Sequence, residues 1–343
     1  MPTADDWLAV RAYLAEHRHT LAVDAVAEYP DTPTVAGTPL LTTPSWLPPE
    51  PVQLTAITLH RGGSTRFAAP PAALPEPHRT YSSAMAALAA PAVFQNRATY
   101  RLLDADLSVP RVDFGAGTYF DGIDFGEACA HEYAARRLGL VDALDLRDAI
   151  GAPCDPTRRP TNVAISTLTL RVDRHAGTAD LYLHWRDPKR VGHAGGLYQV
   201  VPVGVFQPAA DDRADFSLWR CVVREFSEEL LGTPETAPTD YDRWPFAARL
   251  TGELGTRVRV TCLGMGVDPL TLATDLLTVA AIDAEVFDDL FGTPVDTNDE
   301  GRVLDAQPFT EDTITRFVHH EPTQAAGAAL LALAWAHRDT LLA

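Results

Sequence analysis

Residues 224–232, Arg-Glu-Phe-Ser-Glu-Glu-Leu-Leu-Gly, combine three carboxylates with one guanidinium. At about 100° per residue on a helix, Arg224, Glu225, Glu228 and Glu229 fall within an arc of about 140°. Apolar residues at i, i+3 and i+4 spacing occupy the other face, which predicts an amphipathic helix packed on a core. Carboxylates at this spacing repel one another, and hard divalent cations prefer carboxylate oxygens. The pattern therefore indicates either a metal site or a solvated acidic face.

The run Arg-Glu-apolar-x-Glu-Glu resembles the helical half of the Nudix box, G-x5-E-x7-R-E-U-x-E-E-x-G-U. Upstream, residues 197–207 are similar to the strand and turn that lead into such a helix, with Gly204 matching the second Gly of the turn. Downstream, residues 298–300 and 309–311 are similar to the acidic loop and the start of the final helix in that family. The resemblance covers residues 162–342.

Three positions of the box differ in this chain. The upstream Glu is replaced by Phe216, the leading Gly would fall at Ala210, and Leu231 precedes a Gly232 that comes one residue late. The match to the turn also requires residues 208–215 to be an insertion. The resemblance therefore implies chemistry of the family's general kind, with a diphosphate loop that is altered.

For the site, the resemblance implies that Glu225, Glu228 and Glu229 hold Mg²⁺ or Mn²⁺ against a diphosphate, with Glu228 and Glu229 as catalytic residues. In-line attack by a metal-oriented water is the expected reaction. Arg224 is expected to be structural and to brace the loop through an ion pair with a helix carboxylate. Gly204 is expected to shape the turn.

Four candidate site residues lie between the turn and the helix. Gln207 occupies the place where many members of the family have a further acid, and its amide oxygen could coordinate a metal or contact substrate. Asp211, Asp212 and Asp215 could replace the missing Glu. We interpret this acidic, Ala-rich stretch instead as a flexible surface loop.

Further candidates come from outside the box. Arg186 follows the second predicted strand and could contact a phosphate, and Trp185 could stack on a base or ring. His184 and Trp185 alternate faces, so one of them is expected to line the cleft. Asp299 and Glu300 could supply a distal metal ligand or a general base, or they form an ordinary turn.

A second metal pattern is Glu127-x3-His131, which i, i+4 spacing places on one face of a predicted helix over residues 124–137. Such pairs are common without function. The sequence contains no Ser-His-Asp or Cys-His signature, P-loop or strand-linked G-x-G-x-x-G, so acyl transfer, kinase-like chemistry and Rossmann cofactors have no support.

The net charge of −18 argues against a nucleic-acid-binding surface, which needs a basic footprint. An anionic substrate requires metal ions or local arginines to reverse the potential. The four cysteines form no C-x-x-C pair, which is typical of a reducing cytoplasm. Neither a signal peptide nor an apolar run approaching about 18 residues is evident, so we expect a cytoplasmic protein without a membrane span.

The chain is long enough for two domains, and the proline-rich stretch 151–160 is the predicted linker. Residues 1–155 read as an α+β region of unknown role. Residues 156–343 alternate strands with the carboxylate helix, as in the mixed-sheet α/β/α sandwich that the Nudix resemblance implies. The last predicted helix, residues 323–342, is apolar on most sides and could seal a core or an interface, so a homodimer is possible.

We therefore expect a Mg²⁺- or Mn²⁺-dependent Nudix-like hydrolase acting on a nucleoside-diphosphate-linked small molecule. The alternative is a Nudix-fold sensor that binds a nucleotide-like metabolite without turnover. Retention of all three helix carboxylates favours the enzyme, and the altered box favours the sensor.

Overall fold

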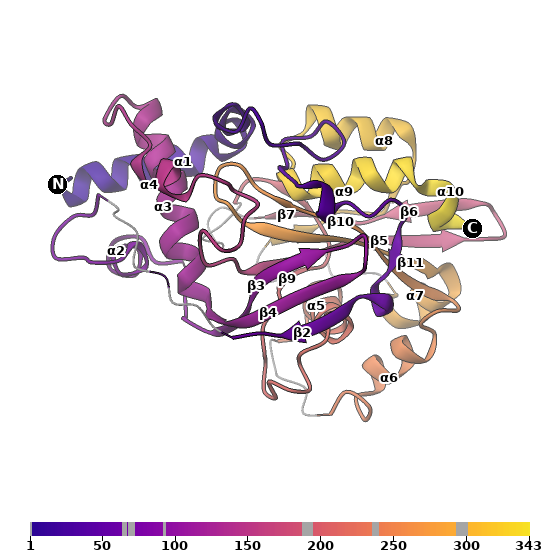
Figure 1. Cartoon of the computed structure of the whole chain (residues 1–343). Helices are drawn as coiled ribbons and strands as arrows, with labels where there is room; N and C mark the ends of the chain where they lie inside the picture. Colours follow the sequence, from indigo (N-terminus) through magenta and orange to yellow (C-terminus); the bar gives the residue numbers. More distant parts are fainter. Residues whose placement is uncertain are drawn as a thin grey trace.

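The computed structural model describes residues 2–63, 67, 73–91, 94–186, 195–234, 240–292 and 301–343. Within these segments the chain forms one seven-stranded sheet and two three-stranded sheets, with helices on their faces (Figure 1). The predicted α+β class with a mixed sheet is confirmed.

The seven-stranded sheet has the order β1-β10-β11-β5-β6-β13, and β9 also pairs with β5. β5 and β11 run parallel, whereas the other neighbours are antiparallel. Its central strands are rich in β-branched and aliphatic residues buried on both faces, as expected between two helical layers. The strands are β1 (Val52–Gln53), β5 (Val163–Asp173), β6 (Thr178–Leu181), β9 (Val203–Val205), β10 (Val258–Val267), β11 (Thr274–Asp283) and β13 (Gln307–Pro308).

Helices cover both faces of this sheet. α5 (Leu218–Leu231) and α7 (Ala284–Phe291) share one apolar cluster with Ile165 and Leu276. α9 (Ala325–Ala336) packs in a second cluster on the opposite face. The final helix was predicted as one element, but α9 ends at Ala336 and α10 spans Arg338–Leu342. α9 buries most of its apolar residues against the sheet, and the homodimer stays a prediction.

The described residues before 155 add four α-helices and a second sheet of order β2-β4-β3. Thr118 and Asp121 form the capping box of α3, so this helix begins five residues before the predicted start at residue 124, and Asp124 accepts a hydrogen bond from Ser82 N. The elements are α1 (Ala4–Ala25), α2 (Tyr81–Leu88), α3 (Tyr119–Arg137), α4 (Asp145–Ile150), β2 (Thr58–Arg61), β3 (Ala98–Asp106) and β4 (Arg111–Thr118).

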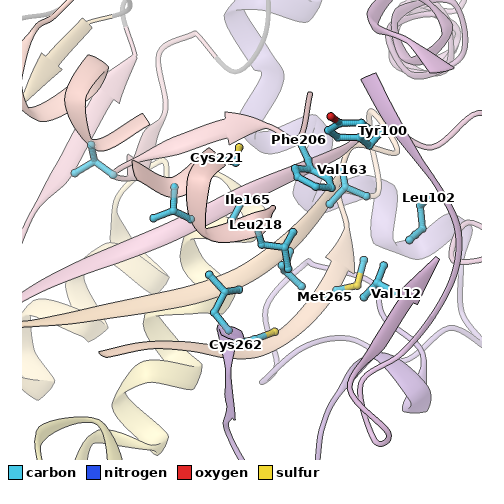
Figure 2. Packing of buried hydrophobic residues seen from close by; sticks show 14 of the residues in the cluster. Tyr100, Leu102, Val112, Val163, Ile165, Phe206, Leu218, Cys221, Cys262 and Met265 are labelled. Carbon is cyan, nitrogen blue, oxygen red and sulfur yellow. The ribbon is translucent and has the colours of Figure 1, made fainter. Parts of the chain in front are cut away.

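One apolar core spans both sides of residue 155. Tyr100 and Val112 pack in the same cluster as Val163, Ile165 and Leu218 (Figure 2). β1 also pairs with β10, although 205 or more residues separate them along the chain (Val52↔Cys262, Gln53↔Thr261). The predicted linker is fixed in place, since the buried Arg159 within it donates to Thr274 Oγ1. A shared core also occurs at domain interfaces, and the division at residue 155 stays a prediction.

Two extended segments each divide between two sheets. Residues 179–185 form β6 and then β7 (Leu183–Arg186), and residues 197–206 form β8 (Tyr198–Val200) and then β9. β7 and β8 join β12 (Gly301–Val303) in the third sheet. The break after β8 falls at Pro202, which has no N–H for a ladder hydrogen bond.

The described helices include none that is both long and apolar enough to cross a membrane. All four cysteines are free thiols, as their spacing predicts.

Candidate functional site

The carboxylate helix α5 forms where its sequence predicts it. The Ser217 hydroxyl caps its first turn by accepting a hydrogen bond from Arg220 N at 3.3 Å. Gly232 ends it in the left-handed conformation at φ 65°, which favours glycine. The apolar face, including Val222 and Phe226, lies in the core. The buried face fixes the rotation of the helix and therefore the direction of its carboxylates.

Two of the three carboxylates lie against the start of β9. Val203 N donates to Glu229 Oε1 at 3.1 Å, and Glu229 is 6% exposed. A Cβ added to Gly204 would lie 1.9 Å from Glu225 Cδ, so the Glu225 carboxylate rests on the glycine backbone. Glu228 is half-buried. The interpretation as a solvated acidic face is therefore wrong for Glu229.

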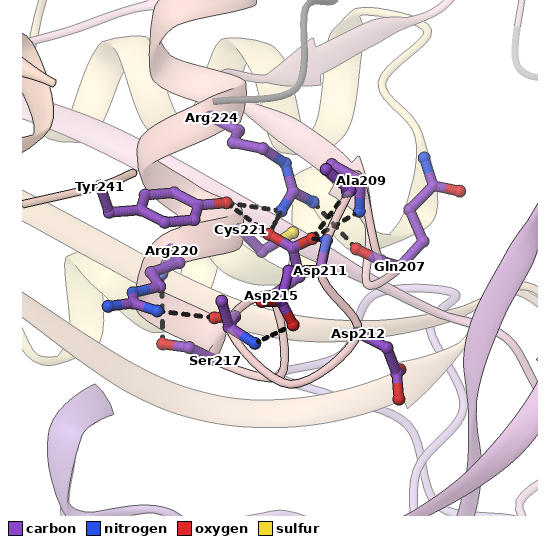
Figure 3. A network of polar contacts seen from close by, with 12 residues as sticks. Gln207, Ala209, Asp211, Asp212, Asp215, Ser217, Arg220, Cys221, Arg224 and Tyr241 are labelled. Carbon is purple, nitrogen blue, oxygen red and sulfur yellow. Dashed lines mark hydrogen bonds and ion pairs between the residues drawn. The ribbon is translucent and has the colours of Figure 1, made fainter. Parts of the chain in front are cut away.

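Arg224 braces the loop that precedes its own helix (Figure 3). Its Nη1 donates to Asp215 Oδ1 at 3.2 Å and to the Tyr241 hydroxyl at 3.0 Å, and its Nη2 donates to the Gln207 carbonyl oxygen at 3.0 Å. The predicted structural role agrees with these contacts. The predicted partner was wrong, because the paired carboxylate lies before the helix and not on it.

Asp215 is the acid of this loop that pairs with Arg224. It is 1% exposed, and its Oδ2 accepts hydrogen bonds from the N–H groups of Ala209, Ala210 and Asp211 at 2.8–3.0 Å. Burial raises the pKa of the carboxyl. The hydrogen bonds from Tyr241 and the backbone together lower it by more, so the net pKa lies below its ordinary value. The interpretation of residue 215 as part of a flexible surface loop is wrong.

The two other acids of this loop are exposed. Asp211 Oδ1 accepts from the N–H groups of Arg213 and Ala214 and so forms a local turn. Asp212 pairs with Arg61 at the surface. Phe216, at the box position of the Glu, packs instead on the aromatic cluster with Phe206. Phe216 is therefore partly buried against the apolar core, whereas Asp215 beside it pairs with Arg224.

Tyr241 belongs to this network, although no sequence pattern predicts its role. Its hydroxyl donates to Asp215 Oδ1 at 2.7 Å and accepts from Arg224. Burial raises the pKa of this phenol to about 12, so the phenol keeps its proton at neutral pH. Tyr241 comes from a segment beyond α5, and no spacing rule relates it to the box.

The predicted substrate-binding residues fall into two groups. Gln207 joins the α5 network through its backbone carbonyl, and in Figure 3 its side-chain amide extends away from Asp215. Trp185 and Arg186 are half-buried on β7, where they pair with β8 and β12. His184 is buried on the other side of that strand, so the two rings alternate faces as expected. Asp299 and Glu300 lie outside the described residues.

The Glu127–His131 pattern is not a metal pair. Glu127 forms ion pairs with Arg11 and Arg18, and the Tyr81 hydroxyl lies 3.2 Å from His131 Nδ1. Burial, together with the nearby Arg11 charge, lowers the pKa of His131 to about 3. Among all described residues, no group of three or more His, Cys, Asp or Glu side chains is gathered closely enough to hold a metal ion. A metal bound at α5 therefore requires its carboxylates to converge.

Comparison with models of known protein families and with curated proteins gives no match for this sequence.

Proposed function

We propose that the chain is a Mg²⁺- or Mn²⁺-dependent Nudix-like hydrolase that cleaves a nucleoside-diphosphate-linked pyrophosphate in the cytoplasm, on a C-terminal α/β/α sandwich. The observation that carries the proposal is the placement of Glu225 and Glu229 against the start of β9. The Arg224–Asp215 pair supports it, because it fixes the loop between β9 and α5 although the box Glu is absent.

The residues present suit a hard divalent cation. Glu225, Glu228 and Glu229 would hold it, and the absence of a Cβ at Gly204 lets the Glu225 carboxylate lie against the turn. When bound, the cation supplies charge neutralisation of the diphosphate and an acidified water. Such neutralisation matters for a chain of net charge −18 that binds an anion.

The remaining roles in the reaction are assigned to side chains of the protein. The Val203 N–H holds Glu229 in place, and Glu228, one residue earlier on the same face of α5, is proposed to accept a proton from the attacking water. Water adds to one phosphorus, the anhydride P–O bond breaks, and two phosphate monoesters leave. In this proposal Arg186 and Gln207 contact the diphosphate and Trp185 stacks on the base.

The proposal is tested by incubating the protein with ADP-ribose and dinucleotide polyphosphates in the presence of Mg²⁺ or Mn²⁺. We expect phosphate monoesters to appear with the divalent ion and to vanish when a chelator removes it. Hydrolysis that persists at full rate in the chelator contradicts the proposal.

A Gly204→Ala substitution tests the contact between the turn and α5. The added methyl group would overlap the flexible Glu225 carboxylate and not backbone, so the side chain moves and the fold survives. We expect Mg²⁺ affinity to fall about tenfold, as for other groups that orient metal ligands. Gly252→Ala is the matched control, because a Cβ there meets no atom within 4 Å. Equal Mg²⁺ affinities in both variants would contradict this role of Gly204.

The second candidate function is a sensor, and the changed loop favours it. The Asp215 carboxylate of this loop is fully occupied by the network, so it is not available as a metal ligand. A sensor predicts that a nucleotide-like ligand raises the melting temperature without forming product.

A further inference from the structure

The loop that joins β9 to α5, residues 206–217, is held from two sides. On its inner side, the Asp215 carboxylate pairs with Arg224 and accepts hydrogen bonds from three N–H groups of the loop itself. The tip of the loop, residues 211–214, is mostly exposed. In Figure 3 the Asp212 side chain points away from the Asp215 network, so other residues must fix it.

Arg61, at the end of β2, makes three contacts with the outer side of this loop. Its Nη1 donates to Asp212 Oδ2 at 2.5 Å, and its Nη2 donates to the Asp212 carbonyl oxygen. Its Cζ lies 4.3 Å from the ring centroid of Phe216, within the range of a cation–π contact. One guanidinium therefore joins the tip of the loop to the residue that precedes the Ser217 cap of α5.

Tyr100, on β3 of the same small sheet, supports this contact. Its hydroxyl donates to the Asp212 carbonyl oxygen at 2.8 Å, and its N–H donates to the Phe206 carbonyl oxygen at 3.0 Å. The Arg61 guanidinium lies 5.5 Å from the Tyr100 ring as well. Residues of β2 and β3 thus contact the loop at its start, at its tip and, through Phe216, at its end.

These contacts give a role to a residue that departs from the Nudix box. Phe216 stands where the box has Glu, and its ring meets the Arg61 guanidinium. The same ring lies 5.0 Å from the Tyr100 ring and 5.8 Å from the Phe206 ring, between centroids. The aromatic side chain therefore links Arg61 to the apolar core beneath the loop.

The Arg61 contacts are suited to holding a loop and add little to the stability of the whole fold. The Arg61 and Asp212 side chains are 45% and 63% exposed, and ion pairs at such positions contribute little to global stability. Exposed loops also open locally at a much lower free energy than the core. Loss of Arg61 should therefore increase opening of the tip while α5 and the large sheet stay folded.

We propose that Arg61 is a positioning residue that holds the β9–α5 loop closed for substrate binding at the α5 site. The proposal rests on the function proposed above, in which Gln207 at the start of this loop contacts the diphosphate. Substrate then binds only those molecules whose loop is closed, so its apparent affinity falls with that fraction.

This role predicts that substrate binding and metal binding respond differently. Glu225 lies against Gly204, and Glu229 accepts from Val203 N, so β9 and its approach hold both carboxylates. Opening of the loop tip leaves these contacts in place. Loss of Arg61 should raise the KM for substrate, whereas kcat and the Mg²⁺ affinity stay near their wild-type values.

Steady-state hydrolysis of ADP-ribose and calorimetric titration of Mg²⁺ test the proposal. Arg61→Ala should raise KM about tenfold, with little change in kcat or Mg²⁺ affinity. Arg61→Lys should recover part of the loss, because an ammonium still pairs with Asp212 but has no planar group to stack on Phe216. Arg111→Ala is the matched control, since Arg111 is 49% exposed and pairs with Asp113 inside the small sheet, and its KM should equal that of wild type.

Asp212→Ala separates positioning from a direct contact between Arg61 and the diphosphate. Positioning through Asp212 predicts a KM about threefold higher, a smaller rise because the carbonyl and ring contacts of Arg61 remain. A direct contact predicts an equal or lower KM, because Arg61 loses a competing carboxylate. Wild-type KM in Arg61→Ala or in Asp212→Ala overturns the proposal.

Amide hydrogen exchange measures the loop without turnover. The N–H groups of Ala209, Ala210 and Asp211 are bonded to Asp215 Oδ2, so their exchange reports opening of the loop. We expect exchange about threefold faster or more in Arg61→Ala, and wild-type rates in Arg111→Ala. Unchanged exchange in Arg61→Ala overturns the proposal. If the wild type hydrolyses no diphosphate, the function proposed for α5 fails, and the exchange rates still decide whether Arg61 holds the loop.

Discussion

Replacing Asp215 with Ala is expected to lower the free energy of unfolding by about 3–5 kcal/mol, the cost of breaking a buried ion pair from one side. The substitution leaves the Arg224 guanidinium buried without its carboxylate, and it removes the acceptor of the Tyr241 hydroxyl and of three backbone N–H groups. Urea denaturation followed by tryptophan fluorescence measures the change.

Asp212→Ala is the matched control for this prediction. The two aspartates belong to the same loop, but the Asp212 side chain is 63% exposed and pairs with Arg61 at the surface. Surface pairs contribute about 0–1 kcal/mol, so this variant should unfold near the wild-type urea concentration. Equal destabilisation by the two substitutions would contradict the role given to Asp215.

The pKa of Asp215 also fixes the sign of a pH effect. Its folded-state pKa is lowered from the ordinary 3.8, so its contribution to stability is present above that value and is lost as the pH falls through the folded pKa. The stability difference between wild type and Asp215→Ala should therefore be constant at neutral pH and shrink below about pH 4. A difference that widens toward acid would contradict the lowered pKa.

The second large effect is expected for Glu229→Gln, which should reduce metal-dependent turnover about 100-fold or more, a loss typical of removing charge stabilisation at a reaction centre. Glutamine keeps an oxygen that can accept from Val203 N, so the variant removes the charge while the helix contact remains. Melting temperature and steady-state kinetics are measured together. Glu50→Gln, at an exposed position, is the control. Turnover within threefold of wild type in a folded Glu229→Gln protein would contradict a catalytic role for Glu229.

The helices and strands around the candidate site could be predicted because short-range sequence patterns mark their ends and their buried faces. α5 has an apolar stripe, a Ser at its N-cap and a Gly at its end, and these fix its bounds within one residue. β5, β10 and β11 are runs of β-branched and aliphatic residues. Their pairing, with β5 parallel to β11, depends on distant segments and could not be derived from periodicity.

The predictions that were wrong concern features that tertiary contacts determine. Apolar residues alternate in the same way whether a strand stays in one sheet or passes into another. The sequence therefore does not show that β6 and β7 are separated at Tyr182. A spacing rule places the acid of the box at residue 216. The acid that meets Arg224 is Asp215, since the fold of the loop, and not the residue count, determines which side chain turns inward. Tyr241 reaches the same point from another segment.

The central claim is that the α5 carboxylates bind a divalent cation. Calorimetric titration of Mg²⁺ and Mn²⁺ into the wild type and into the Glu225→Gln/Glu229→Gln double variant tests it most directly. We expect binding in the wild type and none in the double variant, with both proteins folded. Binding that survives in the double variant, or no binding in the wild type even with ADP-ribose present, would contradict the claim.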